Sequence, residues 1–229
     1  EEMARQADCR KKIWEASTLL LELVNEVLDM GKLESGEVVL ENVPFDLPEL
    51  IHEITDVLEK QAEERGIVLH REYGRLPHPR LVGSPLHVKR LLMNVLSNAI
   101  KYNREKGRVM LDCFELSCTG DKVQIGFVGA DTGIGISEEF QQRMFEPFTQ
   151  ENAGARSVYG GTGLGMSITK SLVDKMGGTI GVESKQGVGT TYTITLPFAI
   201  DNTATEEPER QQTDLTVLRG RQVLLAEDN

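Results

Sequence analysis

Two asparagines with helical spacing are the first residues whose chemistry stands out. Asn94 and Asn98 lie four residues apart, with Lys101 and Tyr102 one turn later, so all four occupy neighbouring positions on one helix face. Amide oxygens are hard ligands of the kind that Mg²⁺ combines with water and phosphate oxygens, and a lysine can donate to phosphate. Without further context, this spacing is more typical of two amides on a helix surface.

A short glycine-containing motif, residues 131–136 (DTGIGI), follows a predicted strand. The carboxylate of Asp131 can accept a hydrogen bond from an exocyclic amine, and Gly133 and Gly135 let the backbone approach a planar ring closely. A hydrogen bond to a charged acceptor contributes about 1.5–3 kcal/mol. A tight turn without any ligand explains the same residues equally well.

A second glycine-rich stretch, residues 160–165 (GGTGLG), directly precedes a predicted helix. Successive backbone N–H groups at such a helix start can bind an anion. The stretch is not a Walker loop, because no Gly-Lys-Ser/Thr follows it, and it lacks the preceding strand of a dinucleotide-binding fold. Taken alone, it is weak evidence for any ligand.

Alternating helix and strand patterns must position these motifs. Ser84 can cap a helix with Pro85 at its first position, running to about Ile100. Helices and antiparallel strands in this order predict a two-layer α/β sandwich. The other predicted elements are a weak strand at 37–40, a helix from 47 to near Gly66, strands at 67–73, 108–116 and 122–128, a short helix after Ser137, a helix at about 163–176, and a strand pair around 187–189.

Apolar residues of the N-terminal segment repeat every seven positions with a three-residue offset, which predicts a coiled-coil-like seam on one long helix. We expect Gly31 and residues 34–36 to end this helix. A second copy of the chain would cover the seam in a homodimer; packing back on the domain is the alternative. The seam residues are Ile13, Ala16, Leu20, Leu23, Val27 and Met30.

Composition excludes several classes of protein. A net charge of −11 argues against nucleic-acid binding, which needs clustered lysine and arginine. No apolar run approaches the roughly 18 residues of a membrane span, so we expect a cytoplasmic fragment, although a longer parent protein could be membrane-anchored. The spacing of Cys9, Cys113 and Cys118 supports neither a disulfide framework nor a zinc site.

The combined motifs resemble those of sensor histidine kinases, within the wider family that includes gyrase, the Hsp90 chaperone and MutL ATPases. Residues 94–102 (NVLSNAIKY) look like the N box and 131–135 like the G1 box. Residues 145–148 (FEPF) look like the F box and 161–165 like the G2 box. This resemblance covers about residues 11–198 and implies the Bergerat type of α/β fold.

The resemblance implies ATP and Mg²⁺ as ligands. Asp131 would bind the adenine amine, and Asn98 would bind Mg²⁺ with Asn94 assisting. Together with Lys101, these two asparagines would form the catalytic group, and residues 150–159 would form a lid rooted by Phe145 and Phe148. The implied nucleotide-binding residues are Asn98, Lys101, Tyr102, Asp131, Gly133, Gly135, Phe148, Gly161, Thr162, Gly163, Leu164 and Gly165.

Position 94 separates the subfamilies of this wider family. Hydrolysing relatives resemble one another in having a glutamate one turn before the metal-binding asparagine, whereas this chain has Asn94, a poor base; phosphoryl transfer to histidine is therefore favoured.

The chain departs from the histidine kinase pattern at two other points. Ser84 replaces the usual acidic cap, with little expected loss. No histidine lies in an H box, so we expect the phosphoacceptor to be absent and the fragment to be unable to phosphorylate itself. The four histidines are His52, His70, His78 and His87.

The predicted organisation has four parts. Residues 1–33 resemble the second helix of a dimerisation hairpin, residues 37–200 form the catalytic domain, and residues 201–220 form a linker. Residues 221–229 resemble the first strand of a receiver domain, which indicates a hybrid kinase with a receiver or response regulator as partner. A module that only binds nucleotide and a gyrase-like ATPase are the two rival interpretations.

Overall fold

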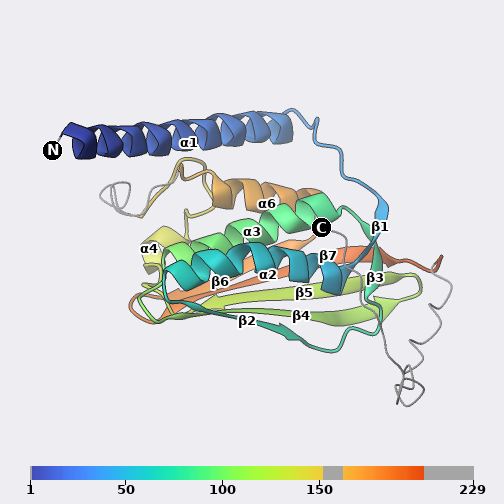
Figure 1. Ribbon diagram of the computed structural model, residues 1–229. Helices are drawn as coiled ribbons and strands as arrows, with labels where there is room; N and C mark the ends of the chain where they lie inside the picture. Colours follow the sequence, from blue (N-terminus) through green and yellow to red (C-terminus); the bar gives the residue numbers. More distant parts are fainter. Residues whose placement is uncertain (1, 152–161, 204–229) are drawn as a thin grey trace, which may run out of the picture.

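A computed structural model of the chain describes residues 2–151 and 162–203. A mixed sheet has helices on one face, and a long N-terminal helix lies against one of them, α6, on the side away from the sheet (Figure 1). This arrangement confirms the predicted two-layer α/β sandwich. The elements are α1 (Glu2–Glu34), β1 (Val43–Asp46), α2 (Leu47–Glu64), β2 (Val68–Tyr73), β3 (Arg80–Gly83), α3 (Pro85–Lys101), β4 (Arg108–Thr119), β5 (Lys122–Asp131), α4 (Glu138–Gln141), α6 (Gly165–Lys175), β6 (Thr179–Lys185) and β7 (Gly189–Ile200).

The sheet is ordered β1-β3-β7-β5-β4-β2, with β6 also paired to β7. Strands β2 and β4 run parallel, and the other pairs are antiparallel. Strand β6 pairs with the first half of β7 and β3 with its last residues, so both share one edge of that strand. The β5–β7 register places Asp131 opposite Thr190 at one end of the sheet.

The core lies between the sheet and the helices α2, α3 and α6. Burial alternates along β5: Val123, Ile125 and Phe127 face the helices and are at most 1% exposed, whereas Gln124 faces solvent. This period of two is what a sheet covered on one face requires. The apolar stripe of α3, which includes Leu92 and Leu96, packs against these strands and so fixes the helix that holds the candidate ligands.

Two short strands and one helix end differ from the sequence predictions. Residues 37–40, predicted as a weak strand, form no strand. The first strand is instead β1, which starts at Val43 and pairs with β3, a strand that the sequence did not predict. Each has only four residues, too few to show a periodic pattern. Helix α1 continues through Gly31 to Glu34, because its last turns pack against α6 and tertiary contacts outweigh the low helix propensity of glycine.

The prediction that the Ser84 side chain caps α3 is also wrong. Ser84 occupies the N-cap position, but its side chain makes no capping hydrogen bond. The Ser84 hydroxyl instead lies 2.6 Å from Nδ1 of His87 and accepts a hydrogen bond from the backbone N–H of Glu41 at 3.2 Å. Burial lowers the pKa of His87. Ser84 therefore joins the segment before β1 to α3 rather than closing the helix end.

Helix α1 divides into two parts with different surroundings. Near its C-terminus, Met30 and Leu33 pack with Val38 against a buried cluster on and before α6, made of Leu164, Ile168 and Leu172. Further towards the N-terminus, Ile13, Leu20 and Val27 are 65%, 62% and 49% exposed. The C-terminal part of α1 therefore packs back on the domain, which was the alternative to a homodimer. A partner for the exposed N-terminal part of the seam stays a prediction.

Candidate functional site

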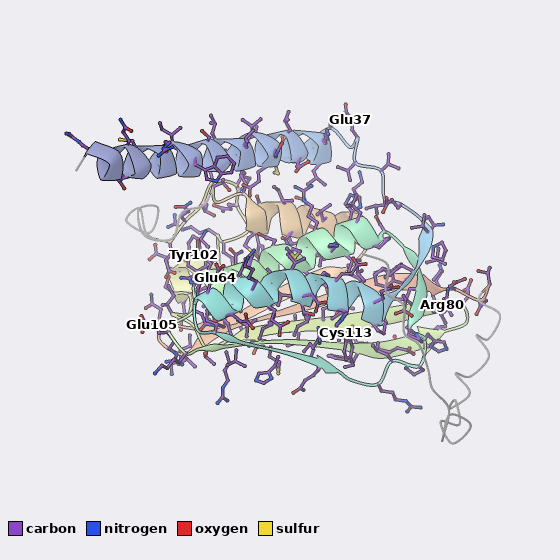
Figure 2. All side chains as sticks on the ribbon, in the orientation of Figure 1. Glu37, Glu64, Arg80, Tyr102, Glu105 and Cys113 are labelled. Carbon is purple, nitrogen blue, oxygen red and sulfur yellow. The ribbon has the colours of Figure 1, made fainter. Side chains whose placement is uncertain are left out.

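A cavity of about 710 Å³ opens where α3, the end of β5 and the start of α6 meet, within the usual size range of small-molecule sites. Polar groups from α3 and β5 meet apolar side chains around it. Figure 2 shows Tyr102, one of the lining residues, near the end of the domain opposite to Arg80. The lining residues are Glu26, Asn94, Ser97, Asn98, Ala99, Lys101, Tyr102, Asp131, Ile134, Gly135, Ile136, Phe140, Met144, Thr149, Gln150, Glu151, Thr162, Gly163, Gly165, Met166, Thr190 and Tyr192.

Asp131 ends β5 and points its carboxylate towards this cavity. Its Oδ1 accepts a hydrogen bond from the backbone N–H of Gly133 at 2.7 Å, and the backbone N–H of Thr190 also donates to the carboxylate. Burial raises the pKa of Asp131, and the two N–H donors oppose that rise only in part. The carboxylate is therefore held in one orientation with acceptor capacity left for a ligand.

The two G1 glycines have a structural reason in addition to the predicted one. A Cβ atom at Gly133 would lie 2.4 Å from the carbonyl oxygen of Tyr102, and one at Gly135 would lie 2.0 Å from that of Lys185. Gly135 also has a φ of +67°, which favours glycine. The glycines thus let the loop close onto the end of α3 and the β6–β7 turn. Gly135 lines the cavity, and close approach of either glycine to a planar ring stays a prediction.

Asn94 and Asn98 both line the cavity from α3 and are partly buried. The Asn94 Nδ2 donates to Thr169 Oγ1 at 2.7 Å, and the Asn98 Nδ2 lies 3.5 Å from the sulfur of Met166. These contacts face α6, so the pair is not an ordinary pair of exposed amides. Asn94 also joins α3 to α6, which is a structural role that the sequence did not reveal.

Lys101 and Tyr102 end α3 at the rim of the same cavity. The Lys101 Nζ lies 5.0 Å from the centroid of the Tyr102 ring, within the range of a cation–π contact. Burial raises the pKa of Tyr102, so its hydroxyl stays protonated as a donor. The two side chains thus place a cation and a hydroxyl together beside Asn98.

The start of α6 brings part of the second glycine-rich motif to the cavity. Thr162, Gly163 and Gly165 line it, whereas Leu164 is fully buried in the core and donates its backbone N–H to Thr162 Oγ1 at 3.1 Å. The Leu164 side chain thus faces the core, and a contact between Leu164 and a ligand stays a prediction. Gly161 and residues 152–159 of the predicted lid lie outside the described residues.

The two phenylalanines of residues 145–148 differ in their surroundings. Phe145 packs against the core, which agrees with a role as an anchor. Phe148 is 60% exposed, has a φ of +61° and is not among the described residues that line the cavity, so its roles as anchor and ligand contact stay predictions. Backbone atoms of Phe148 and Thr149 instead pack on Gly163, where a Cβ atom would lie 2.7 Å from the Thr149 oxygen.

Several lining residues were not predicted from the sequence. Tyr192 and Thr190 belong to the buried face of β7, and alternation along that strand was the only available signal for them. Met166 contacts both asparagines. Glu26 reaches the cavity from α1 and accepts a hydrogen bond from Thr162 Oγ1, a contact that depends on how α1 docks and has no local sequence pattern.

Comparison with known proteins agrees with the geometry of the site. Residues 83–200 match the family described as histidine kinase-, DNA gyrase B- and HSP90-like ATPases. The sensor histidine kinase GacS of Pseudomonas protegens is 37% identical over 192 residues, covering 84% of this chain and 21% of GacS. The histidine-protein kinase BarA of Escherichia coli K12 is 33% identical over 225 residues, covering 98% of this chain and 24% of BarA.

Solved structures agree with this result. Full-length ShkA in complex with AMPPNP has a TM-score of 0.71 and 28% identity, covering 86% of this chain and 39% of ShkA. The catalytic domain of the histidine kinase ThkA has a TM-score of 0.55 and 26% identity, covering 69% of this chain and 95% of that domain. The matched region of this chain thus corresponds to nearly the whole of the ThkA catalytic domain.

The chain therefore belongs to the histidine kinase-, DNA gyrase B- and HSP90-like ATPase family. Within that family it is the ATP-binding catalytic domain of a sensor histidine kinase of two-component signalling. The chain spans about a fifth to a quarter of the length of these curated relatives. Among the described residues, no helix is long and apolar enough to cross a membrane.

Proposed function

We propose that the cavity binds ATP with Mg²⁺ and that the domain transfers the γ-phosphoryl group to a histidine on another helix. The observation that best supports this proposal is Asp131, a half-buried carboxylate fixed by two backbone N–H groups beside a cavity of suitable size. A buried acceptor of this kind selects a ligand that offers a hydrogen-bond donor, such as the exocyclic amine of adenine.

The remaining lining residues fit the other parts of ATP. Apolar side chains, among them Ile134, Met144 and Tyr192, would enclose the adenine ring. Lys101 would donate to the phosphates at the rim, and Tyr102 to the ribose or the phosphates. The backbone at Gly163 and Gly165 would let the phosphate tail approach α6 closely.

The two asparagines would hold the metal ion. Asn98 turns its amide nitrogen towards Met166, which directs its oxygen away from α6, the orientation that suits an oxygen ligand. Asn94 is held by Thr169 and would assist through its own oxygen or by fixing the metal's water shell. When bound, Mg²⁺ neutralises charge on the phosphates during transfer.

Phosphoryl transfer is favoured over hydrolysis because α3 offers no base at position 94. One carboxylate that lines the cavity, that of Glu26, is bonded to Thr162 rather than set one turn before Asn98. None of the four histidines, all of which lie in the described part of the chain, lines the cavity: His52 pairs with Asp56, His78 pairs with Glu115, His87 is buried beside Ser84, and His70 is exposed on β2. This supports an acceptor histidine on a separate helix.

The proposal extends to the longer protein. The exposed seam of α1 would pair with a second copy to form a homodimer, and a receiver domain or response regulator would accept the phosphoryl group from the histidine. Residues 201–220, proposed as a linker, and residues 221–229, proposed as the start of a receiver, lie almost wholly outside the described residues. The similarity to BarA over 98% of the chain supports the proposed linker and receiver segments.

A transfer assay with a separate acceptor tests the proposal. The chain is incubated with radiolabelled ATP, Mg²⁺ and a peptide that carries an H-box helix, and acid-labile phosphohistidine on the peptide is measured. The wild type should label the peptide, and Asn98→Ala should not. Nucleotide binding without labelling would favour a module that only binds ATP, and steady phosphate release without the peptide would favour an ATPase.

A further inference from the structure

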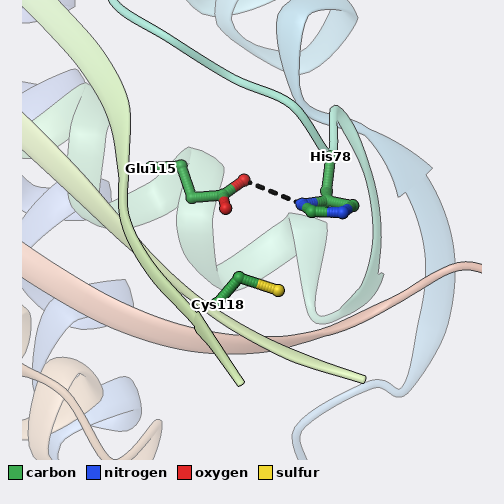
Figure 3. Close-up of side chains that lie close together, drawn as sticks. All are labelled: His78, Glu115 and Cys118. Carbon is green, nitrogen blue, oxygen red and sulfur yellow. Dashed lines mark hydrogen bonds and ion pairs between the residues drawn. The ribbon is translucent and has the colours of Figure 1, made fainter. Parts of the chain in front are cut away.

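A group of three potential metal ligands lies outside the nucleotide cavity. His78, in the loop before β3, and Glu115 and Cys118, on β4, point towards one another (Figure 3). The His78 Nδ1 lies 3.0 Å from Glu115 Oε2, and the three ligand atoms all lie within 4.8 Å of one another. One nitrogen, one oxygen and one sulfur ligand thus converge on one point.

An irregularity in β4 brings two of these ligands to the same face of the sheet. Residues three apart on a regular strand point to opposite faces. Between Glu115 and Ser117 the β4–β5 register shifts by one residue, so Glu115 pairs with Ile125 and Cys118 with Val123. These two partners are both buried on the helix-covered face, so Glu115 and Cys118 also point there. β-bulges commonly redirect side chains in this way.

Backbone hydrogen bonds hold the His78 loop against the same strand. Gly74 donates to the carbonyl oxygen of Cys113 at 2.9 Å, and Glu115 donates to that of Arg75 at 3.0 Å. The Glu115 side chain is 9% exposed and that of His78 is 36% exposed, so the group is partly shielded but accessible to an ion. It lies at the end of the β4–β5 hairpin opposite to Asp131.

We propose that His78, Glu115 and Cys118 form a binding site for a divalent transition-metal ion, with Zn²⁺ as the best fit. Imidazole, carboxylate and thiolate are the three ligand types that Zn²⁺ accepts, and three protein ligands leave a fourth position open to water. Mg²⁺ and Ca²⁺ require oxygen ligands and do not suit a thiolate. With Glu115 and Cys118 both ionised, the bound site has no net charge.

The geometry needs only a small adjustment. Tetrahedral Zn²⁺ with bonds of about 2.0–2.3 Å places its ligand atoms roughly 3.3–3.8 Å apart. Since the three atoms lie within 4.8 Å of one another, no separation has to shrink by more than about 1.5 Å. Rotation of the exposed Cys118 side chain can supply this change. Binding transfers the Cys118 thiol proton to solvent and joins the loop before β3 to the β4–β5 hairpin, which stabilises the folded chain.

Titration of the whole chain with Co²⁺, a spectroscopic substitute for Zn²⁺, tests the proposal. A Co²⁺–thiolate bond gives a near-ultraviolet charge-transfer absorption, which the nucleotide cavity cannot produce because no cysteine lines it. We expect this band in the wild type, its displacement by Zn²⁺, and a rise in the unfolding temperature with Zn²⁺. Cys118→Ser should remove the band, and His78→Ala and Glu115→Gln should weaken Co²⁺ binding at least about tenfold, equal to about 1.4 kcal/mol.

Matched variants make the result decisive. Cys9→Ser removes another exposed cysteine, and His52→Ala removes another histidine that pairs with a carboxylate, and both should keep the band. No charge-transfer band in the wild type, or a band that persists in Cys118→Ser, would overturn the proposal. His78 and Glu115 would then be an ion pair that fastens the loop, with Cys118 an incidental neighbour. If Glu115→Gln fails to fold, the exposed Cys118→Ser variant still decides.

Discussion

Replacement of Asp131 by asparagine tests the adenine site most directly. The change keeps the size of the side chain and an oxygen acceptor for the Gly133 and Thr190 N–H groups, so the loop should keep its shape. It removes the charge that would accept the adenine amine. Because a hydrogen bond to a charged acceptor is worth about 1.5–3 kcal/mol, the affinity for nucleotide should fall about tenfold to a hundredfold.

The assay is calorimetric titration of a non-hydrolysable ATP analogue with Mg²⁺ into the wild type and the variant. A second titration uses the inosine counterpart, which has a carbonyl oxygen in place of the amine. Asp131 should bind this base poorly, whereas an asparagine amide can donate to it, so the variant should lose most or all of the preference for adenine. Asp112→Asn is the matched control, because Asp112 lies on β4 with its neighbours Leu111 and Cys113 buried on the other face.

Stability separates a local effect from unfolding. Burial raises the pKa of Asp131, so the folded state binds more protons there than the unfolded state, and ionisation at neutral pH costs stability. The Asp131→Asn variant should therefore unfold at the same temperature as the wild type or higher. Equal loss of affinity for both nucleotides, or unchanged affinity for the adenine nucleotide, would refute this account of Asp131.

Three further predictions concern the same cavity. Asn98→Ala should weaken nucleotide binding in Mg²⁺ but much less in EDTA, and calorimetry in both buffers checks this difference. Glu26→Gln should strengthen nucleotide binding about twofold to fivefold, because it removes one negative charge that repels the phosphates. At a partly exposed site this repulsion is worth at most about 1 kcal/mol. A weaker affinity would contradict this prediction. Nucleotide affinity should fall when Asp131 becomes protonated. Because the pKa of Asp131 is raised, this fall should occur at a higher pH than for an ordinary aspartate, and it should be absent in Asp131→Asn.

Long elements and local motifs could be predicted from the sequence because their signals are local. The α3 stripe, the Pro85 start and the β4–β5 hairpin all appear at the predicted places. The resemblance to histidine kinases implied that Asn98 and Asp131 serve one ligand, and both residues line one cavity, although their ligand roles stay predictions. Four-residue strands such as β1 contain too few positions for a period to be recognised.

Features that depend on tertiary contacts could not be predicted. The Ser84 hydroxyl had two partners available, the helix backbone and His87, and only the folded structure shows that it contacts His87. Glu26 enters the cavity because α1 packs on α6. Cysteine spacing gave no zinc motif because the proposed ligands His78 and Cys118 come from separate segments, and the shift in register has no clear sequence signal.

Helix α1 would act as a lever if it moved as a rigid rod. Its 33 residues span about 50 Å. The Glu26–Thr162 hydrogen bond, an Asp29–Arg90 ion pair and the packing of Met30 and Leu33 on α6 all lie near its C-terminal end. If the helix pivots as a rigid rod at Glu34, its far end lies about four times as far from the pivot as Glu26. A displacement of about 2 Å that breaks the Glu26–Thr162 hydrogen bond therefore corresponds to about 8 Å at the tip. Small movements at the cavity and large movements at the far end of α1 are then one motion.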